Sequence, residues 1–185
     1  MYYKIKIAGL ERDLPICKVN DSLSIGAFVM FGDVELTKAS AEALLKVIPE
    51  HDYMLTAESK GIPLTYEMAR QSGNNKYFLA RKSAKLYMRD VFSVNVKSIT
   101  TAASQTLYLD GYDAAEIKGK RIVIVDDVIS TGESLHALEE LVTKAGGTVV
   151  GRLCVLAEGD AVKRDDIKYL AYLPLFNPDG TEKPL

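Results

Sequence analysis

Residues 121–134 read RIVIVDDVISTGES, and this stretch decides the fold. Residues 121–125 contain a continuous β-branched run, which predicts a strand buried on both faces of a parallel sheet. Two adjacent carboxylates, Asp126 and Asp127, follow at its carboxyl end, where open α/β sheets bind their ligands. Because like charges repel and burial disfavours ionisation, such a pair needs compensation by ribose hydroxyls, a hydrated magnesium ion, or both.

The polar turn after the acid pair has the composition of a phosphate site. Residues 130–134 bring three hydroxyls and a glycine to the start of a helix. The first amides of a helix lack partners within it and lie at the positive end of its dipole. Carboxylates about one ribose away suit a sugar 5-phosphate. Taken singly, Ser130 or Thr131 can equally cap the helix, but the complete ordered run favours a ligand site.

Outward from this stretch, strands and helices alternate. Apolar residues at helical spacing predict helices over residues 36–48, 63–71 and 135–145. Short apolar runs predict further strands over residues 53–57, 76–80 and 148–156. This alternation implies parallel pairing through right-handed crossovers. We therefore expect an α/β fold with a mostly parallel central sheet flanked by helices.

The segment 91–111 breaks the alternation. Apolar and polar residues alternate at 94–97 and again at 107–110, with the small residues 100–104 between them. This pattern predicts an antiparallel arm that projects from the sheet. A long excursion inside a compact domain is often functional.

The stretch 121–134 resembles the signature with which type I phosphoribosyltransferases bind 5-phosphoribosyl 1-pyrophosphate (PRPP). That signature is a hydrophobic strand, Asp-Asp, two apolar residues and a Ser/Ala-Thr-Gly loop. The resemblance implies that Asp126 and Asp127 contact the ribose hydroxyls and take part in catalysis. It also implies that the 5-phosphate is bound by Ser130, Thr131, Gly132, Glu133 and Ser134. Glu133 stands where the family often has glycine, so we expect only its backbone N–H to contact the phosphate.

Two further motifs follow the order found in this family. Residues 58–61 are similar to the pyrophosphate loop of its purine enzymes, and residues 81–85 carry an Arg-Lys-x-x-Lys pattern similar to that of adenine and xanthine phosphoribosyltransferases. The resemblance implies that pyrophosphate is bound by Glu58, Ser59, Lys60, Gly61, Arg81, Lys82 and Lys85, with Arg81 also catalytic. Without the resemblance, Gly61 would be explained as the start of a helix, and the basic residues of 81–85 as a solvated surface. The charge complementarity between this cluster and a pyrophosphate favours the functional interpretation.

The resemblance covers residues 53–156 and implies a type I phosphoribosyltransferase fold. We expect a single domain, residues 1–185, with a small hood partly from residues 1–35 and 165–185 and a flexible arm at about 82–111 that serves as a lid. Mg²⁺ is expected to bind with PRPP and to neutralise the leaving pyrophosphate. No direct metal ligand is assigned, although Asp126 or Asp127 can reach the ion through water. A homodimer is also expected from the resemblance.

Recognition of the base is poorly specified by the sequence. Apolar side chains that can pack on a purine are Val128, Ile129, Ile25 and Phe28, although each also suits the core. The Arg-Lys-x-x-Lys pattern favours adenine, with xanthine or hypoxanthine as the alternative. Adenine enzymes usually carry Leu-Glu-Tyr-Gly where residues 107–111 read LYLDG, so the expected glutamate is missing. Asp110 is either its substitute or an acid in a hairpin turn.

The bulk properties argue against several other classes. The chain has 185 residues, of which 48% are hydrophobic and 26% charged, so one globular domain is expected. Its net charge of −2 gives no basic field for nucleic acid, and no apolar run is long enough for a membrane span or a signal peptide. We expect a cytoplasmic protein that binds PRPP and a purine base, and neither nucleic acid nor a membrane.

Two rival functions remain. A non-catalytic PRPP-sensing regulator would also keep the Asp-Asp loop, and the missing glutamate keeps this alternative open. A PRPP synthase-like or pyrimidine enzyme is disfavoured by the Arg-Lys-x-x-Lys pattern.

Overall fold

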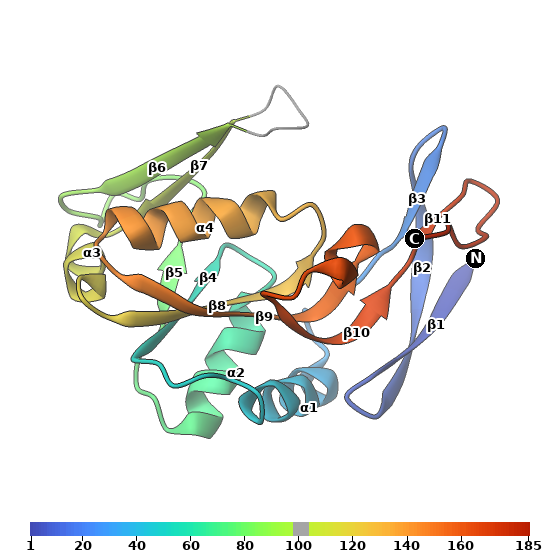
Figure 1. Cartoon of the computed structure of the whole chain (residues 1–185), viewed down its shortest axis with the longest axis horizontal. Helices are drawn as coiled ribbons and strands as arrows, with labels where there is room; N and C mark the ends of the chain where they lie inside the picture. The colour runs from blue at the N-terminus through green and yellow to red at the C-terminus, as the bar shows by residue number, and fades with distance from the viewer. Residues whose placement is uncertain (98–103) are drawn as a thin grey trace.

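The computed structural model describes residues 1–97 and 104–185, and its centre is a five-stranded sheet (Figure 1). In spatial order the strands are β10 (Lys168–Leu173), β9 (Thr148–Glu158), β8 (Arg121–Ile129), β4 (Tyr53–Ala57) and β5 (Phe78–Ala80). All four pairings are parallel, which confirms the expected α/β architecture.

Helices cover both faces of this sheet (Figure 1). On one face lie α1 (Val34–Leu45) and α2 (Ile62–Ser72); on the other lie α3 (Gly111–Ile117) and α4 (Glu133–Lys144). The central position of β8 explains why its sequence is apolar without alternation. Ile122 and Ile124 face the core under α4, whereas Val123 and Val125 face the core under α1 and α2. Each of these side chains is at most 1% exposed, so β8 is the spine of both cores.

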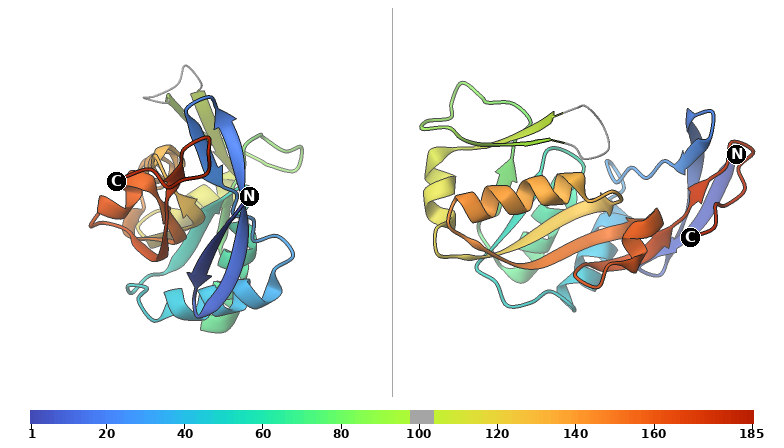
Figure 2. Two further views of the ribbon diagram at one scale, coloured as in Figure 1. Left: turned by 90° about the vertical axis from the view of Figure 1, so that its right-hand side faces the viewer. Right: turned by 45° about the horizontal axis from the view of Figure 1, so that its top comes forward.

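A second, antiparallel sheet lies beyond the carboxyl ends of the parallel strands (Figures 1 and 2). It contains β1 (Tyr2–Ile7), β2 (Leu10–Asn20), β3 (Leu23–Gly26) and β11 (Leu175–Phe176), in this order. The N-terminal and C-terminal segments therefore meet in one sheet, at the position where a hood would cover a ligand.

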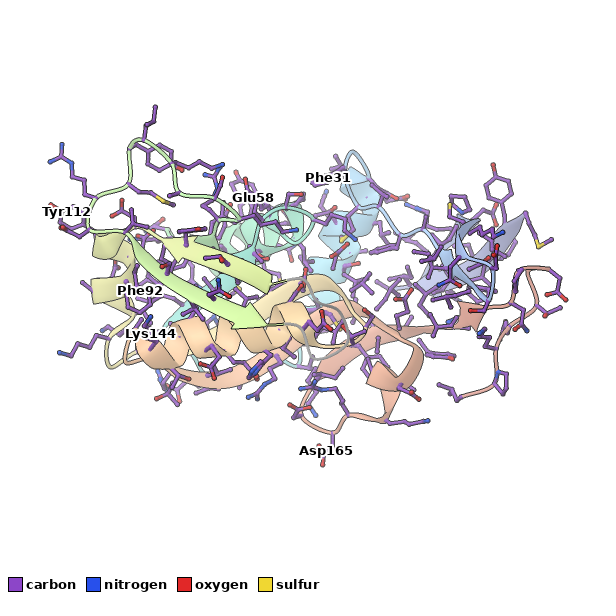
Figure 3. All side chains as sticks on the ribbon, turned by 90° about the horizontal axis from the view of Figure 1, so that it is seen from above. Phe31, Glu58, Phe92, Tyr112, Lys144 and Asp165 are labelled. Atoms are coloured by element: carbon purple, nitrogen blue, oxygen red, sulfur yellow. The ribbon has the colours of Figure 1, made fainter. Side chains whose placement is uncertain are left out.

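The excursion between β5 and β8 contains an antiparallel pair, β6 (Phe92–Lys97) and β7 (Ser104–Leu109), which starts with Phe92 opposite Leu109. Its inner side packs against α4, with Leu107 and Leu109 fully buried. Lys144 of α4 donates to the carbonyl of Ser93 at 2.9 Å and lies over the ring of Phe92 (Figure 3). Residues 100–103, expected between the two strands, lie outside the described residues.

Several element boundaries differ from the expectation. Strand β8 continues four residues past Val125, because β9 also continues and pairs Ile129 with Ala157. The acid pair therefore lies inside the strand and not after it. Helix α3 was not expected, and Asp110 is its N-cap, accepting from the amide of Tyr112 at 3.0 Å, so the expectation of a hairpin-turn acid was wrong.

The other boundaries shift by two or three residues at most. Helix α1 ends at Leu45, three residues before the predicted end, and β5 begins at Phe78, two residues after its predicted start. In the part of the chain that the structure describes, no helix has the length and apolarity needed to cross a bilayer.

Candidate active site

The strand order of the central sheet locates the site. Numbered along the chain, the parallel strands lie in the order second, first, third, fourth, fifth, so the order reverses between β4 and β8. Ligands of such sheets bind in the crevice at the carboxyl ends of the two strands that flank the reversal. A cavity of about 180 Å³ lies there. It is lined by Ala57, Glu58, Ser59, Lys60, Lys82, Asp126, Asp127, Val128 and Ser134.

Gly61 brings the loop after β4 against the end of β8. A Cβ at this position would overlap Thr56 Oγ1 and would lie 3.3 Å from both Cα and Oδ1 of Asp126. Only glycine allows this approach without displacing the backbone of the acid pair. The same loop is fixed from the other side, because the amide of Glu58 donates to the carbonyl of Ala80 in β5 at 2.8 Å.

The two acids of the pair are connected to each other, with Asp127 buried and Asp126 half-buried. Asp127 is 3% exposed, and its amide donates to Oδ1 of Asp126 at 2.9 Å. Burial, and then the neighbouring charge of Asp127, raise the pKa of Asp126 to about 7. Near neutral pH the pair therefore holds a proton for part of the time, and it prefers partners that donate hydrogen bonds, as sugar hydroxyls do.

Lys60 and Asp127 form an ion pair across the cavity. Lys60 Nζ lies 2.9 Å from Asp127 Oδ2, with the lysine half exposed and the aspartate buried. The cation expected to meet pyrophosphate is thus paired with an acid expected to meet the ribose. A third carboxylate, Glu158 at the end of β9, belongs to the same electrostatic group: burial raises its pKa, Lys60 opposes this and Asp127 adds to it.

The turn into α4 has the backbone of an anion site. Its N-cap is Gly132, with φ +81° and ψ 4°, so the cap residue has no side chain that could accept from the first amides of the helix. Ser130 and Thr131 are exposed and precede the cap, which argues against the simple capping role considered for them. Residues 130–135 line a pocket of about 40 Å³ together with Asp126, Val128 and Ile129. Amides at the start of a helix and hydroxyls around a small pocket are the donors that bind a phosphate group.

Arg81 is held by Glu58 and Tyr87. Its Nη2 lies 3.0 Å from Glu58 Oε1, and its Nη1 donates to the Tyr87 hydroxyl. The other oxygen of Glu58 accepts from the amide of Lys82 at 3.0 Å, and this bond and the arginine lower the pKa of Glu58. Arg81 Nε is buried and has no acceptor among the residues described. Glu58 therefore orients an arginine that keeps one donor for a ligand.

The remaining expected residues are dispersed. Lys85 donates to the Ser83 hydroxyl at 2.7 Å on an exposed surface and, like Arg81 and Gly61, does not line the cavity. Among the four expected base contacts, Phe28 and Ile129 are at most 5% exposed and belong to the two cores. Ile25 pairs with Leu175 in the hood, and only Val128 lines the 180 Å³ cavity.

Three residues at the site had no sequence signal: Glu158, Tyr87 and Arg164. Arg164 Nη1 lies 2.8 Å from where a Cβ on Gly132 would stand, and Gly132 lines the pocket of about 40 Å³. In the sequence it belongs to the charged run 163–166, which is typical of a solvated surface. Glu158 follows an apolar strand as a single acid, and such residues are common at strand ends.

The donor set tests whether Mg²⁺ fits. Within the described residues, no three His, Cys, Asp or Glu side chains gather closely enough to hold a metal ion. The pair Asp126 and Asp127 offers carboxylate oxygens to the cavity, with Asp127 buried and Asp126 half-buried. Mg²⁺ usually keeps several waters and binds through one or two carboxylates plus the phosphates of a substrate. The site therefore fits a magnesium ion that arrives with a diphosphate.

Comparison with known proteins gives one family. The family model for the phosphoribosyl transferase domain matches residues 35–176. An adenine phosphoribosyltransferase of Petrotoga mobilis is 31% identical over 142 residues, covering 74% of this chain and 76% of that protein. A hypoxanthine/guanine phosphoribosyltransferase of Methanococcus voltae is 32% identical over 125 residues, covering 68% of this chain and 63% of that protein.

Solved structures of the same fold are more distant in sequence. The adenine phosphoribosyltransferase from Thermoanaerobacter pseudethanolicus superposes with a TM-score of 0.64 at 20% identity, covering 93% of this chain and 95% of that one. The enzyme from Trypanosoma brucei, solved with AMP, pyrophosphate and ribose-5-phosphate, gives a TM-score of 0.66 at 18% identity, covering 100% of this chain and 81% of that one.

Proposed function

Because the chain belongs to the phosphoribosyl transferase domain family, we propose that it transfers the 5-phosphoribosyl group of PRPP to a ring nitrogen of a purine, with release of pyrophosphate. One observation carries the proposal. The acid pair, Lys60 of the loop after β4 and Ser134 of the turn into α4 line a single cavity, and Asp126 and Ser134 also line the small pocket formed by that turn. This arrangement matches the hydroxyls, the diphosphate and the 5-phosphate of one PRPP molecule.

The roles of the residues follow from their chemistry. Asp126 and Asp127 accept from the two ribose hydroxyls and place negative potential near the anomeric carbon, where positive charge develops as the bond to pyrophosphate breaks. Lys60, Lys82 and Arg81 neutralise the departing diphosphate, with Arg81 oriented by Glu58. Magnesium bound with PRPP would supply further positive charge on that side of the sugar.

We propose adenine as the preferred base. Support comes from the Arg-Lys-x-x-Lys pattern at residues 81–85 and from the similarity to the Petrotoga mobilis adenine enzyme. Several relatives of similar identity are named hypoxanthine/guanine phosphoribosyltransferases, so a 6-oxopurine is the second candidate. We also propose that the protein acts in the cytoplasm, as a homodimer, and without nucleic acid.

The experiment is a base panel. The protein is incubated with magnesium, PRPP and one base at a time (adenine, hypoxanthine, guanine, xanthine, orotate or uracil), and nucleotide and pyrophosphate are measured. Formation of AMP with a kcat/KM at least tenfold above that of any oxopurine supports the adenine proposal. Turnover of an oxopurine alone would replace adenine with that base. Binding of PRPP without turnover of any base would favour a sensor over an enzyme.

A further inference from the structure

A guanidinium lies beside the turn assigned to the 5-phosphate, from a part of the chain that the family motifs do not include. Arg164 follows the short 3-10 helix η1 (Gly159–Lys163), which Figure 1 shows in orange-red between β9 and β10, next to the loop that leads into α4. Its Nη1 lies 2.8 Å from where a Cβ on Gly132 would stand. Gly132 therefore leaves the guanidinium room to reach the turn.

The orientation of Arg164 is fixed from the opposite edge. Its Nε donates to Asp166 Oδ1 at 2.9 Å and its Nη2 to Asp166 Oδ2 at 2.8 Å. Because the guanidinium is planar, this bidentate contact directs the remaining nitrogen, Nη1, away from Asp166 and toward Gly132. Two-thirds of the Arg164 side chain is buried, so its mobility is restricted on both sides.

Asp166 is itself tied to the helix that begins at the turn. Arg152 Nε lies 3.5 Å from Asp166 Oδ2 and also contacts Glu139 of α4. The chain of charges from Arg164 to Glu139 thus connects η1, β9 and α4. A surface network of this kind contributes little stability on its own. It does connect Arg164 to Glu139 in the second turn of α4.

A cation beside the turn would strengthen its binding of a phosphate. Its own donors are neutral backbone amides and hydroxyls, while a phosphate monoester carries a charge between −1 and −2 at pH 7. We propose that Arg164 is a binding residue for the 5-phosphate of PRPP and donates through Nη1 to a phosphate oxygen held by residues 130–134. This inference rests on the proposed function, since it presupposes a sugar phosphate in that turn.

The test measures binding separately from turnover. Arg164→Gln, Arg164→Lys and, as matched control, Arg152→Gln are made in the full chain. Arg152 belongs to the same ion-pair network but pairs with Ile124, five residues before the end of β8, and so lies further from the turn. Binding of ribose 5-phosphate and of free pyrophosphate is measured by calorimetry, and KM for PRPP and for the base by steady-state kinetics.

Loss of a charge-assisted hydrogen bond corresponds to a change in affinity of about 10-fold to 100-fold. We expect Arg164→Gln to weaken ribose 5-phosphate and to raise KM for PRPP by this factor, with pyrophosphate binding changed less than about twofold. Arg164→Lys should retain part of the affinity, and Arg152→Gln nearly all of it.

Three results would overturn the inference. They are unchanged binding of ribose 5-phosphate by Arg164→Gln, equal weakening of ribose 5-phosphate and pyrophosphate, and equal weakening by Arg152→Gln, which would indicate a purely structural network. The proposed function fails in a different way, when the unmodified protein binds neither ribose 5-phosphate nor PRPP.

Discussion

Replacing Asp126 by asparagine is expected to stabilise the ligand-free protein while removing most of its activity. Burial and the adjacent Asp127 raise the pKa of Asp126 from the usual 3.8 to about 7. A carboxyl whose pKa is raised by folding binds protons more tightly in the folded state, so the protein loses stability as pH rises from about 4 to about 7. Above about pH 7 the loss of stability is close to its full size.

The size of the penalty follows from linkage. A pKa higher by about three pH units, at about 1.36 kcal/mol each, corresponds to roughly 4 kcal/mol of unfolding free energy. This is an upper limit, because part of Asp126 touches the cavity and the two acids titrate together. Asparagine keeps the Oδ1 that accepts from the amide of Asp127 and carries no charge to desolvate. We expect a gain of about 1 to 4 kcal/mol at pH 8 and less than half of that gain at pH 5.

The assay is urea unfolding of both proteins at pH 5 and pH 8 without ligand, alongside nucleotide formation. A contrasting variant is Asp52→Asn. Hydrogen bonds from Arg121 lower the pKa of Asp52 to about 2, so this change should destabilise the protein at pH 8, with the opposite sign. Destabilisation by Asp126→Asn at pH 8, or a gain that is independent of pH, would refute the account of the acid pair given above.

Three further predictions concern the cavity. Asp127→Asn should lower kcat by at least about 100-fold with far-ultraviolet circular dichroism unchanged, since one ribose acceptor is lost; full activity would show that the ribose binds elsewhere. Arg81→Ala should raise KM for PRPP at least about fivefold more than KM for the base, because the guanidinium is assigned to the diphosphate; an effect confined to the base would contradict that role, and Lys85→Ala, which removes an exposed amine bonded to Ser83, is the control. Gly61→Ala should weaken pyrophosphate binding about tenfold or more by calorimetry, because the new Cβ meets Thr56 and the backbone of the acid pair; unchanged affinity would mean that the loop can move aside freely. Gly73→Ala is the contrasting variant, because its Cβ meets no atom within 4 Å and only its positive φ of 76° is strained, whereas Gly61 has a negative φ.

The sequence was most informative where local pattern and tertiary role coincide. The β-branched run before Asp126 is apolar on every side because both faces of β8 are covered, and this requirement acts on each residue separately. The end of β8 was misplaced because the polarity of Asp126 and Asp127 suggests a loop, whereas pairing with β9 continues through Ile129. Strand length here depends on a neighbouring strand, which local patterns do not report.

Residues that reach the site from distant segments were the ones missed. Arg164 comes close to Gly132 only through the fold of η1, and its own surroundings in the chain are ordinary charged residues. The hood strands were also not predicted individually. Strand β2 alternates in burial from Leu10 to Cys17, but only Leu14 is fully buried and the half-buried position 12 is an arginine, so the apolar alternation that identifies a half-buried strand is incomplete in the sequence.

The contact between Lys60 and Asp127 has a consequence for which molecules the cavity admits. Because Lys60 and Asp127 already form an ion pair, a simple anion gains little binding free energy in this cavity. If it bound Lys60, it would leave the carboxylate of Asp127 buried and unpaired. A polyol that replaced Lys60 at Asp127 would leave the lysine without its acid, at a smaller cost because the lysine is half exposed. A molecule with both hydroxyl donors and an anionic group can give Asp127 and Lys60 new partners at the same time. The ion pair therefore favours ligands that carry both chemical groups, as a sugar phosphate does.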